Sequence, residues 1–195
     1  RSQSGQNGQP LIPLSFTIHE LCYECDTVRI IQAHHREYIM GNKKHAFTVA
    51  DVDRVTGTGY PPPFNEIATN RSKAKVGDHA GLNQYGVNIV TLPPGEGSAQ
   101  RHWHEQEDEF CYMISGEAIL ITSDGEETIT AGMMMGWPRN VNNGHHLVNR
   151  SGADAVYMEV GMRVSNDVCH YPDIDLHLVI EDDDEEFQHN DGTPY

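Results

Sequence analysis

Short runs of alternating hydrophobic and polar residues fill the middle and later parts of the chain. We interpret them as strands, because side chains alternate between the two faces of a strand. Asp124-Gly125 is the clearest hairpin signal between two of these runs, and Ser115-Gly116 is a second turn. The predicted strands are Tyr85–Leu92, Gln100–His104, Glu109–Ile114, Glu117–Thr122, Glu127–Ile129, His145–Asn149 and Ala155–Met162. Many short strands with glycine-containing turns and no helical spacing predict an all-β sandwich or barrel.

The residues before these strands follow no single period. Residues 1–45 hold hydrophobic runs that fit one or two strands or part of a helix, so their structure stays open. Thr48 is an N-cap candidate with Asp51 three residues later, which predicts a short helix starting there. Residues 57–64 contain three consecutive prolines and predict a loop, and residues 65–81 are polar and turn-rich.

The C-terminal part of the chain carries weaker signals. Residues 169–173 predict a loop, and Leu176–Ile180 predict one edge strand. The acidic run Glu181–Glu186 predicts a solvated loop or tail. The expected organisation is an N-terminal extension over residues 1–45, a β-barrel domain over residues 46–180 and an acidic, turn-rich tail over residues 181–195.

Four residues of metal-binding type lie on the predicted strands. His102 and His104 are two residues apart, so both imidazoles point to the same face of a strand. Glu109 opens the next strand after a short acidic turn, and His145 opens a later one. Three imidazoles and one carboxylate on one face make a site for a divalent first-row metal. Because no thiolate is needed, these residues do not distinguish iron, manganese, nickel, zinc and copper.

The spacing of these residues resembles the first motif of the cupin superfamily. The matching positions are Gly95, His102, His104, Glu109 and Gly116, with six residues after Gly95 where five are usual. The chain from about Ala46 onward looks like a group of small bacterial-type single-domain cupins. The resemblance implies a cupin-type jelly-roll β-barrel with an N-terminal extension.

A second stretch resembles the second cupin motif. It runs from Gly132 through Pro138 to His145 and Asn149. Asn140 stands where a glycine is usual, and the segment from Pro138 to His145 is a few residues longer than normal. By its spacing to Asn149, the fourth ligand is His145, with His146 as the alternative. The resemblance thus implies one divalent transition metal ion per chain, held by His102, His104, Glu109 and His145.

Such a metal keeps open positions for a substrate or for dioxygen. The first hypothesis is a metal-dependent enzyme that acts on a small organic molecule, with an oxygenase as the leading class and a Lewis-acid isomerase or lyase as the alternative. Glu109 is then either a ligand or the catalytic base. The other hypotheses are a non-catalytic cupin that binds or senses a small ligand, and a structural or storage role. The fold alone does not choose between them.

Strand parity also predicts the walls of the substrate pocket. Cys111 and Met113 share the strand face of Glu109, so we expect both to line the pocket, together with Trp137. Such walls suit a small organic substrate with one chelating end. Few basic residues lie near the motifs, and this scarcity disfavours a phosphate-rich substrate. Arg101 and Arg139 are the exceptions.

The charge and composition of the chain exclude some classes of binding partner. The formal net charge of -16 argues against nucleic acid and anionic membranes as partners. The sequence has no apolar run long enough to span a membrane and no secretory pattern at its start. Cys22 and Cys25 lack a second pair that would complete a zinc site, and reduced thiols fit a cytoplasmic setting. The strand edges of a small barrel predict a homodimer.

Overall fold

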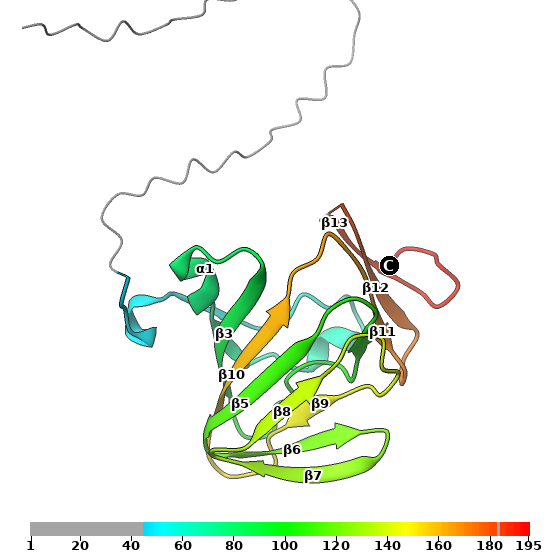
Figure 1. The fold of residues 1–195 in the computed structure, drawn as a ribbon. Coiled ribbons are helices and arrows are strands. Elements are labelled where there is room, and N and C mark those ends of the chain that lie inside the picture. Colours follow the sequence, from blue (N-terminus) through cyan, green and yellow to red (C-terminus); the bar gives the residue numbers. More distant parts are fainter. Residues whose placement is uncertain (1–44, 183) are drawn as a thin grey trace, which may run out of the picture. The chain divides into compact units, whose positions relative to one another are not determined.

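The computed structural model describes residues 45–182 and 184–195. These residues form a β-barrel built from three sheets, as the strand pattern predicted (Figure 1). The strands are β1 (Arg54–Thr56), β2 (Ser72–Ala74), β3 (Tyr85–Leu92), β4 (Trp103–His104), β5 (Glu109–Ser115), β6 (Glu117–Thr122), β7 (Gly125–Thr130), β8 (Met134–Trp137), β9 (His146–Val148), β10 (Ala155–Met162), β11 (Asn166–Tyr171), β12 (Leu176–Glu181) and β13 (Asp184–Gln188). The expected extension, with Cys22 and Cys25, lies outside the described residues.

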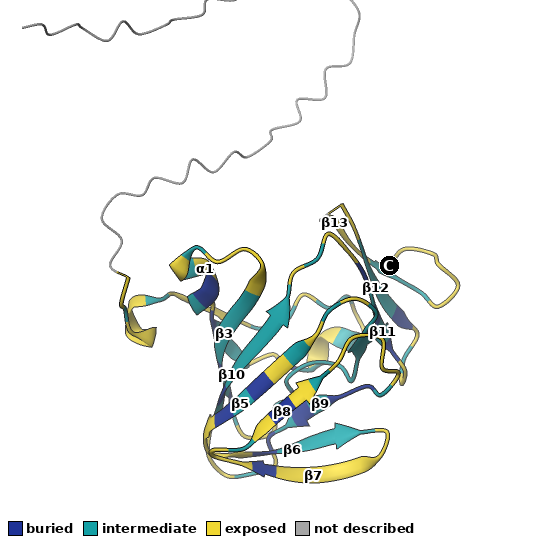
Figure 2. Cartoon of the chain, viewed as in Figure 1, coloured by how far each residue is buried: buried dark blue, intermediate teal, exposed yellow. Residues whose placement is uncertain are grey.

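The largest sheet has six strands in the order β1-β2-β3-β10-β5-β8. β10 is its centre, because it pairs antiparallel with β3 along its whole length and with β5 on its other edge. In β5, Cys111 and Met113 are buried while Phe110 and Ile114 are exposed, so alternate residues face the barrel interior (Figure 2). This alternation sends the side chain of Glu109 inward.

The other two sheets close the barrel. One has the order β7-β6-β9, and the other has the order β13-β12-β11-β4. The main core lies between the first two sheets and consists of Val90, Leu92, Cys111, Met113, Ala118, Ile129, Met135, Leu147, Ala155 and Tyr157. A smaller core forms under the loop over residues 57–64, where Tyr60 and Phe64 pack against Cys169, Tyr171 and Leu176.

The two turns predicted at Asp124-Gly125 and Ser115-Gly116 are confirmed. The turn at Asp124-Gly125 joins β6 to β7, and Gly125 adopts a φ of 127° that favours glycine. Gly116 separates β5 from β6 with a φ of 76°, and a Cβ atom there would overlap the Asp154 carbonyl oxygen. Strands β3, β6 and β10 have the bounds that the alternation predicts.

Several predictions about the flanking segments are wrong. The region over residues 65–81, expected to be turns, contains β2 and a short helix, α1 (Val76–Ala80). The predicted helix near Thr48 is only a single 3-10 turn, η1 (Val49–Asp51), capped reciprocally by Thr48 and Asp51. A second 3-10 turn, η2 (Phe64–Glu66), ends the proline loop.

Residues 169–173 were expected to form a loop, but residues 169–171 belong to strand β11, which begins at Asn166. Its inward residues are Asp167, Cys169 and Tyr171, which are buried although none is aliphatic. A search for hydrophobic alternation therefore misses this strand. The acidic run is also not a free tail, because β12 and β13 form a hairpin in which Glu181 pairs with Asp184.

Candidate metal centre

Three histidines and one glutamate from separate elements meet inside the barrel. The Glu109 Oε2 atom lies 3.0 Å from His145 Nε2, 3.8 Å from His102 Nε2 and 3.9 Å from His104 Nε2. His102 forms a bridge with His145, and β4 carries His104 alongside Cys169 of β11. The residues predicted from spacing are thus brought together by strand pairing between segments far apart in the sequence.

The structure separates the two candidates for the fourth position. His145 is 5% exposed, and its ring stacks on Trp137 with centroids 3.9 Å apart and planes 7° apart. His146 lies outside the cluster, because its Nδ1 atom is 3.0 Å from the Ala99 carbonyl oxygen. The register of the loop after Pro138 therefore presents His145, and not His146, to Glu109.

Hydrogen bonds fix the orientation of two of the imidazoles. The His102 Nδ1–H donates to the Gln100 carbonyl oxygen at 2.7 Å, which leaves the lone pair of Nε2 directed at the cluster. His104 Nδ1 lies 2.5 Å from Asp167 Oδ2 and donates to it, so Nε2 is the nitrogen that faces the cluster. A carboxylate behind a histidine is a common support for a metal ligand. Sequence reasoning missed Asp167, because it lies in a strand whose pattern is not hydrophobic.

The charges of the cluster follow from its burial and its contacts. Burial lowers the pKa of His102 to about 4, so this imidazole is neutral. For Glu109, burial acts against the charge, but a hydrogen bond from His145 and attraction to His102 and His104 outweigh it and lower the pKa to about 2. For His104, burial is outweighed by hydrogen bonds to Asp167 and Cys169, which raise the pKa to about 11. A metal on His104 would therefore displace a proton.

The donor set fits a divalent transition metal. Donors that share one ion through bonds of about 2.1 Å lie at most about 4.2 Å apart. The three distances to Glu109 Oε2 satisfy this limit, although the compact donor group around Glu109 contains His102 and His145 and not His104. His102, Glu109 and His145 form one compact donor group, and the Cys169 sulfur lies near His102 and His104 in another. Imidazole and carboxylate donors suit several first-row ions, so the donor set does not name one.

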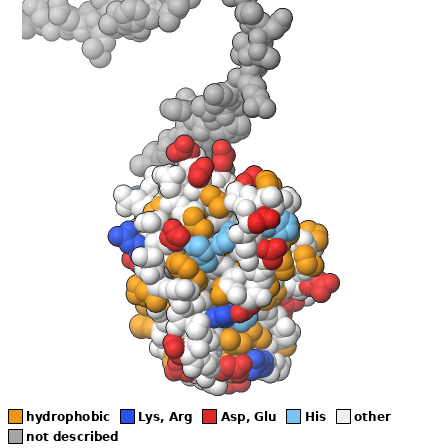
Figure 3. All heavy atoms as spheres, turned by 90° about the vertical axis from the view of Figure 1, so that its right-hand side faces the viewer, with side chains coloured by type: hydrophobic (Ala, Val, Ile, Leu, Met, Phe, Trp, Pro, Cys, Tyr) orange, Lys and Arg blue, Asp and Glu red, His pale blue; other side chains and the backbone are white. Residues whose placement is uncertain are grey.

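A cavity of about 600 Å³ opens beside these donors. Trp137 and Cys111 line it together with His102, Glu109 and His145. Met113 does not line it, although strand parity places it on the same face: it lies one step further along β5, where it is fully buried in the main core. Histidine side chains reach the surface near the middle of one face of the barrel, beside hydrophobic and acidic side chains (Figure 3).

The cavity also has a polar wall that sequence reasoning missed. Arg71, Lys73 and Lys75 line it from β2 and its flanks, and Glu159 lines it from β10. The Lys73 Nζ atom donates to Glu159 Oε1 at 2.6 Å, and Asn88 Nδ2 donates to the same oxygen at 2.9 Å. The spacing of the basic residues, every second position, is the signal that was available, but it lies in a segment interpreted as turns.

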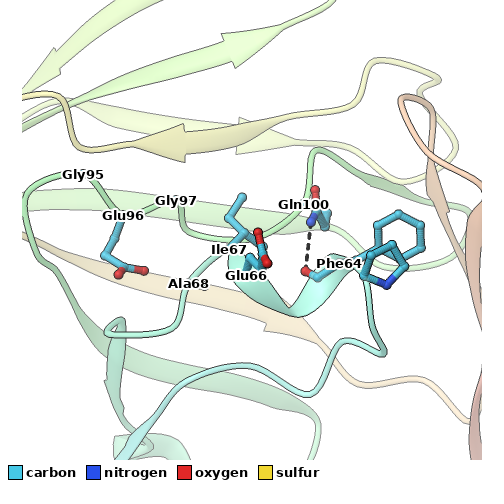
Figure 4. A pocket seen from close by; sticks show the side chains of 9 residues that line it. Phe64, Glu66, Ile67, Ala68, Gly95, Glu96, Gly97 and Gln100 are labelled. Carbon is cyan, nitrogen blue, oxygen red and sulfur yellow. Dashed lines mark hydrogen bonds between the residues drawn. The ribbon is translucent and has the colours of Figure 1, made fainter.

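A smaller hollow of about 400 Å³ is bordered by the segment that precedes His102. Phe64 and Gln100 border it, and the Gln100 Nε2 atom donates to the Phe64 carbonyl oxygen at 3.0 Å (Figure 4). Gln100 therefore links the proline loop to the backbone that orients His102.

Fold and site together define the class of this protein. Residues 88–161 match the family model of a cupin domain. The fold is similar to the crystal structure of a sugar phosphate isomerase from a cupin superfamily, from Silicibacter pomeroyi, with 33% sequence identity and a TM-score of 0.74. That match covers 77% of this chain and 96% of the other chain. The chain belongs to the cupin superfamily.

A more distant structure has the same fold. A proposed sugar phosphate isomerase from Acidithiobacillus ferrooxidans shares 25% identity with a TM-score of 0.60, over 65% of this chain and 80% of its own. No curated protein sequence matches the chain. Among the described residues, no helix has the length and apolar character needed to cross a membrane.

Proposed function

We propose that this cupin is a metal-dependent isomerase that acts on a phosphorylated sugar. The observation that carries the proposal is the Glu159 carboxylate, which shares one cavity with the metal-binding side chains and is held by Lys73 and Asn88. The similarity to a protein named as a sugar phosphate isomerase supports the same class of substrate.

The residues His102, His104, Glu109 and His145 would hold one divalent ion. When bound, the ion supplies Lewis-acid chemistry that polarises a carbonyl group of the substrate. Glu109 acts as a ligand in this proposal, because its carboxylate is directed at all three imidazoles. Asp167 and the Gln100 carbonyl keep two of the imidazoles in the tautomer that binds metal.

Glu159 is the proposed general base. Its Oε1 atom accepts both hydrogen bonds, from Lys73 and Asn88, and Oε2 has no partner among the described residues. Glu159 of β10 pairs with Cys111, and Glu109 is two residues from Cys111 on β5. The Cα atoms of Glu159 and Glu109 are therefore one strand and two residues apart, about 8 Å. A sugar whose carbonyl end lies at the metal donors would place the neighbouring carbon near Glu159.

The proposed reaction moves one proton between adjacent carbons. Glu159 takes the proton from the carbon next to the carbonyl and returns it to the former carbonyl carbon, while a second proton moves between the two oxygens. No atoms are gained or lost in this exchange, so no co-reactant is needed. Trp137 and Cys111 give the cavity an apolar wall that limits the access of water to the intermediate.

The oxygenase class stays a prediction from the donor set, which suits iron as well as other first-row ions. The two classes differ in a measurable way. An oxygenase consumes dioxygen with a chelating substrate when iron(II) is present, whereas an isomerase does not.

The proposed function is tested by metal analysis and proton exchange. The protein is purified without chelators, its metal content is measured, and a panel of sugar phosphates is followed by NMR in D₂O. We expect interconversion of one phosphorylated sugar with deuterium entering at the carbon next to the carbonyl. Glu159→Gln should lower kcat by about 10²-fold or more, which is the usual contribution of a general base, with unchanged metal content.

Glu185→Gln is the matched control, because Glu185 borders the same cavity from the exposed strand β13. It should retain full turnover. Full turnover by Glu159→Gln would overturn the assignment of the base. Oxygen uptake without isomerisation would replace the proposed class with the oxygenase.

We further propose that the chain forms a homodimer through the outer face of the largest sheet. Phe110 is 39% exposed, Ile114 is 43% exposed and Met134 is 65% exposed, and all three belong to the adjacent strands β5 and β8. A second copy of the chain would cover this apolar face.

A further inference from the structure

Unpartnered buried polar atoms gather in one place in this protein. Among the described residues, three buried side-chain atoms lack a hydrogen-bond partner: Arg71 Nε, His145 Nδ1 and Tyr157 Oη. All three residues line the cavity of about 600 Å³ that contains the metal donors. A buried donor without a partner costs about 1 to 3 kcal/mol, so their concentration in one cavity indicates a polar ligand.

Tyr157 belongs to the main core and also to the residues that line the cavity. The residue is 1% exposed and lies on the central strand β10, where it pairs with Val90 of β3 and Met113 of β5. The Ser98 side chain is close enough to act on the Tyr157 hydroxyl group, but the two groups do not meet the geometric criteria of a hydrogen bond. Burial raises the pKa of Tyr157 well above the ordinary value, so the phenol keeps its proton and can donate it in a hydrogen bond.

Arg71 lies near the Tyr157 hydroxyl group, and two hydrogen bonds fix the position of its guanidinium group. Its Nη1 atom donates to the Ser98 carbonyl oxygen, and its Nη2 atom donates to the Gly57 carbonyl oxygen at 2.8 Å. The Nε–H is a buried donor that has no partner. Among the described residues, no carboxylate forms an ion pair with Arg71, so its charge is not neutralised within the protein.

We propose that Arg71 and Tyr157 form an oxyanion subsite that binds a phosphate or carboxylate group of the substrate. This inference rests on the proposed function, because the subsite and the metal donors share one cavity. It gives the substrate two fixed ends: a carbonyl end at the metal donors and an anionic end at Arg71 and Tyr157.

Charges of both signs surround the subsite, because Glu159 acts on Tyr157 as well as Arg71. Lys73 lies on the same sheet face as Tyr157, since both align with Val90 across the strands, but its ammonium group is already paired with Glu159. Lys75 is exposed and borders the cavity, where it adds positive charge near the entrance. Arg71 therefore remains the guanidinium whose charge is available to a bound anion.

The basic residues near the motifs, Arg101 and Arg139, are not the ones that would recognise a phosphate. Arg101 is engaged by Asp173 through two hydrogen bonds of 2.6 and 2.7 Å, and neither arginine lines the cavity. The expectation that basic residues are too scarce for a phosphorylated substrate considered only the motif regions. The fold adds Arg71, Lys73 and Lys75 from a distant segment.

Isothermal titration with inorganic phosphate and with acetate tests the subsite. The full chain is titrated as purified and again after treatment with a chelator. We expect wild type to bind at least one of the two anions in both states, because Arg71 and Tyr157 need no metal. Tyr157→Phe should weaken the dissociation constant about tenfold or more, as expected for a lost hydrogen bond to a charged group. Its thermal midpoint should stay equal to wild type or rise, because the unpartnered hydroxyl is removed.

Tyr112→Phe is the matched control, because Tyr112 lies on the outer side of β5 and does not line the cavity. It should bind anions like wild type. Arg71→Lys keeps the positive charge but removes the Nε donor, and it should also weaken binding. Tighter binding of phosphate would identify a phosphorylated substrate, and tighter binding of acetate would identify a carboxylate substrate.

Three results would overturn the subsite. These are no binding of either anion by wild type, equal binding by wild type and Tyr157→Phe, and complete loss of binding after removal of the metal. The anion titration needs no turnover, so it stays informative if no sugar phosphate is isomerised. Conversely, isomerisation lost in Glu159→Gln with unaltered anion binding by Tyr157→Phe would support the proposed function and refute the subsite.

Discussion

His104 and Asp167 are joined by a hydrogen bond of 2.5 Å between Nδ1 and Oδ2, deep in the barrel. Asp167 is 3% exposed, and its other oxygen accepts the Gln106 backbone N–H at 2.8 Å. Both oxygens of the Asp167 carboxylate therefore accept a hydrogen bond, and the carboxylate fixes the orientation of the His104 imidazole. This arrangement ties the loop before β5 to strand β11 and sets which nitrogen of His104 faces Glu109.

Asp167→Asn should weaken metal affinity about 10- to 100-fold, the usual effect of removing a carboxylate behind a metal-binding histidine. The amide cannot fix the same tautomer of His104. The affinity is measured by competition with a chromogenic chelator. Asp173→Asn is the control, because Asp173 pairs with Arg101 at the surface, and it should bind metal like wild type. Equal affinities for both variants would show that Asp167 does not support the site.

The identity of the fourth ligand gives a second prediction. His145→Ala should lose the bound metal, because the His145 Nε2 atom is 3.0 Å from Glu109 Oε2. His146→Ala should keep it, because His146 is bonded to the Ala99 carbonyl oxygen outside the cluster. Metal content of the two purified variants, measured side by side, decides between them. Metal retained by His145→Ala and lost by His146→Ala would reverse the assignment.

The pKa of His102 predicts how the stability of the metal-free protein depends on pH. Its folded pKa, about 4, lies below the ordinary pKa of 6.5 for a histidine. Between pH 6.5 and pH 4, the His102 side chain binds a proton in the unfolded chain but not in the folded chain. The free energy of unfolding therefore falls as the pH decreases from 6.5 to 4. The loss approaches about 3 kcal/mol at most. The protonation of Glu109, whose folded pKa is about 2, adds a further loss only below the ordinary glutamate pKa of 4.5.

Urea unfolding of the chelator-treated protein at pH 6.5 and pH 5 measures this effect. His102→Gln removes the titrating group while keeping a polar side chain, and its stability should change less between the two pH values. A difference as large as that of wild type would assign the pH dependence to other groups.

How far the sequence predicts this site depends on the kind of residue. His102, His104 and Glu109 are close in the chain, so local strand geometry is enough to place them together. His145 needs a long-range pairing, and the spacing to Asn149 gives its register. Arg71, just before β2, and Tyr157, in β10, could not be found this way, because nothing in their own segments shows which cavity they border.

The strand β11 illustrates the same limit from another direction. Its inward positions are occupied by Asp167, Cys169 and Tyr171, which contact site residues and the proline loop instead of an aliphatic core. Hydrophobic periodicity detects strands whose inner face packs against an aliphatic core. It therefore misses a strand whose inner face makes polar contacts.

Asn149 gives a prediction for stability. It is fully buried, and its Nδ2 atom donates to the carbonyl oxygens of Leu92 and Ala153 at 2.7 and 2.8 Å. Its Oδ1 atom accepts from the backbone and hydroxyl of Ser151. Asn149→Ala should lower the free energy of unfolding by about 2 to 4 kcal/mol, because it leaves these buried groups unpartnered.

Chemical denaturation measures this change, with Asn70→Ala as the control. Asn70 is exposed and bonds only to Thr69 and Glu96 at the surface, so its loss should cost less than about 1 kcal/mol. A cost for Asn149→Ala no greater than that of the control would mean that water replaces its hydrogen bonds.

The proposed dimer gives the last prediction. Phe110, Ile114 and Met134 leave the outer face of β5 and β8 apolar, while the inner face of the same strands packs the core. Met134→Glu, placed at the most exposed of these positions, should convert a dimer into a monomer, because burial of its charge in an interface is costly. Light scattering in dilute solution measures the mass.

Leu82→Glu, at a residue that is 39% exposed beside α1, should leave the mass unchanged. A wild-type mass of one chain, or a dimeric mass for Met134→Glu, would exclude an interface on this face.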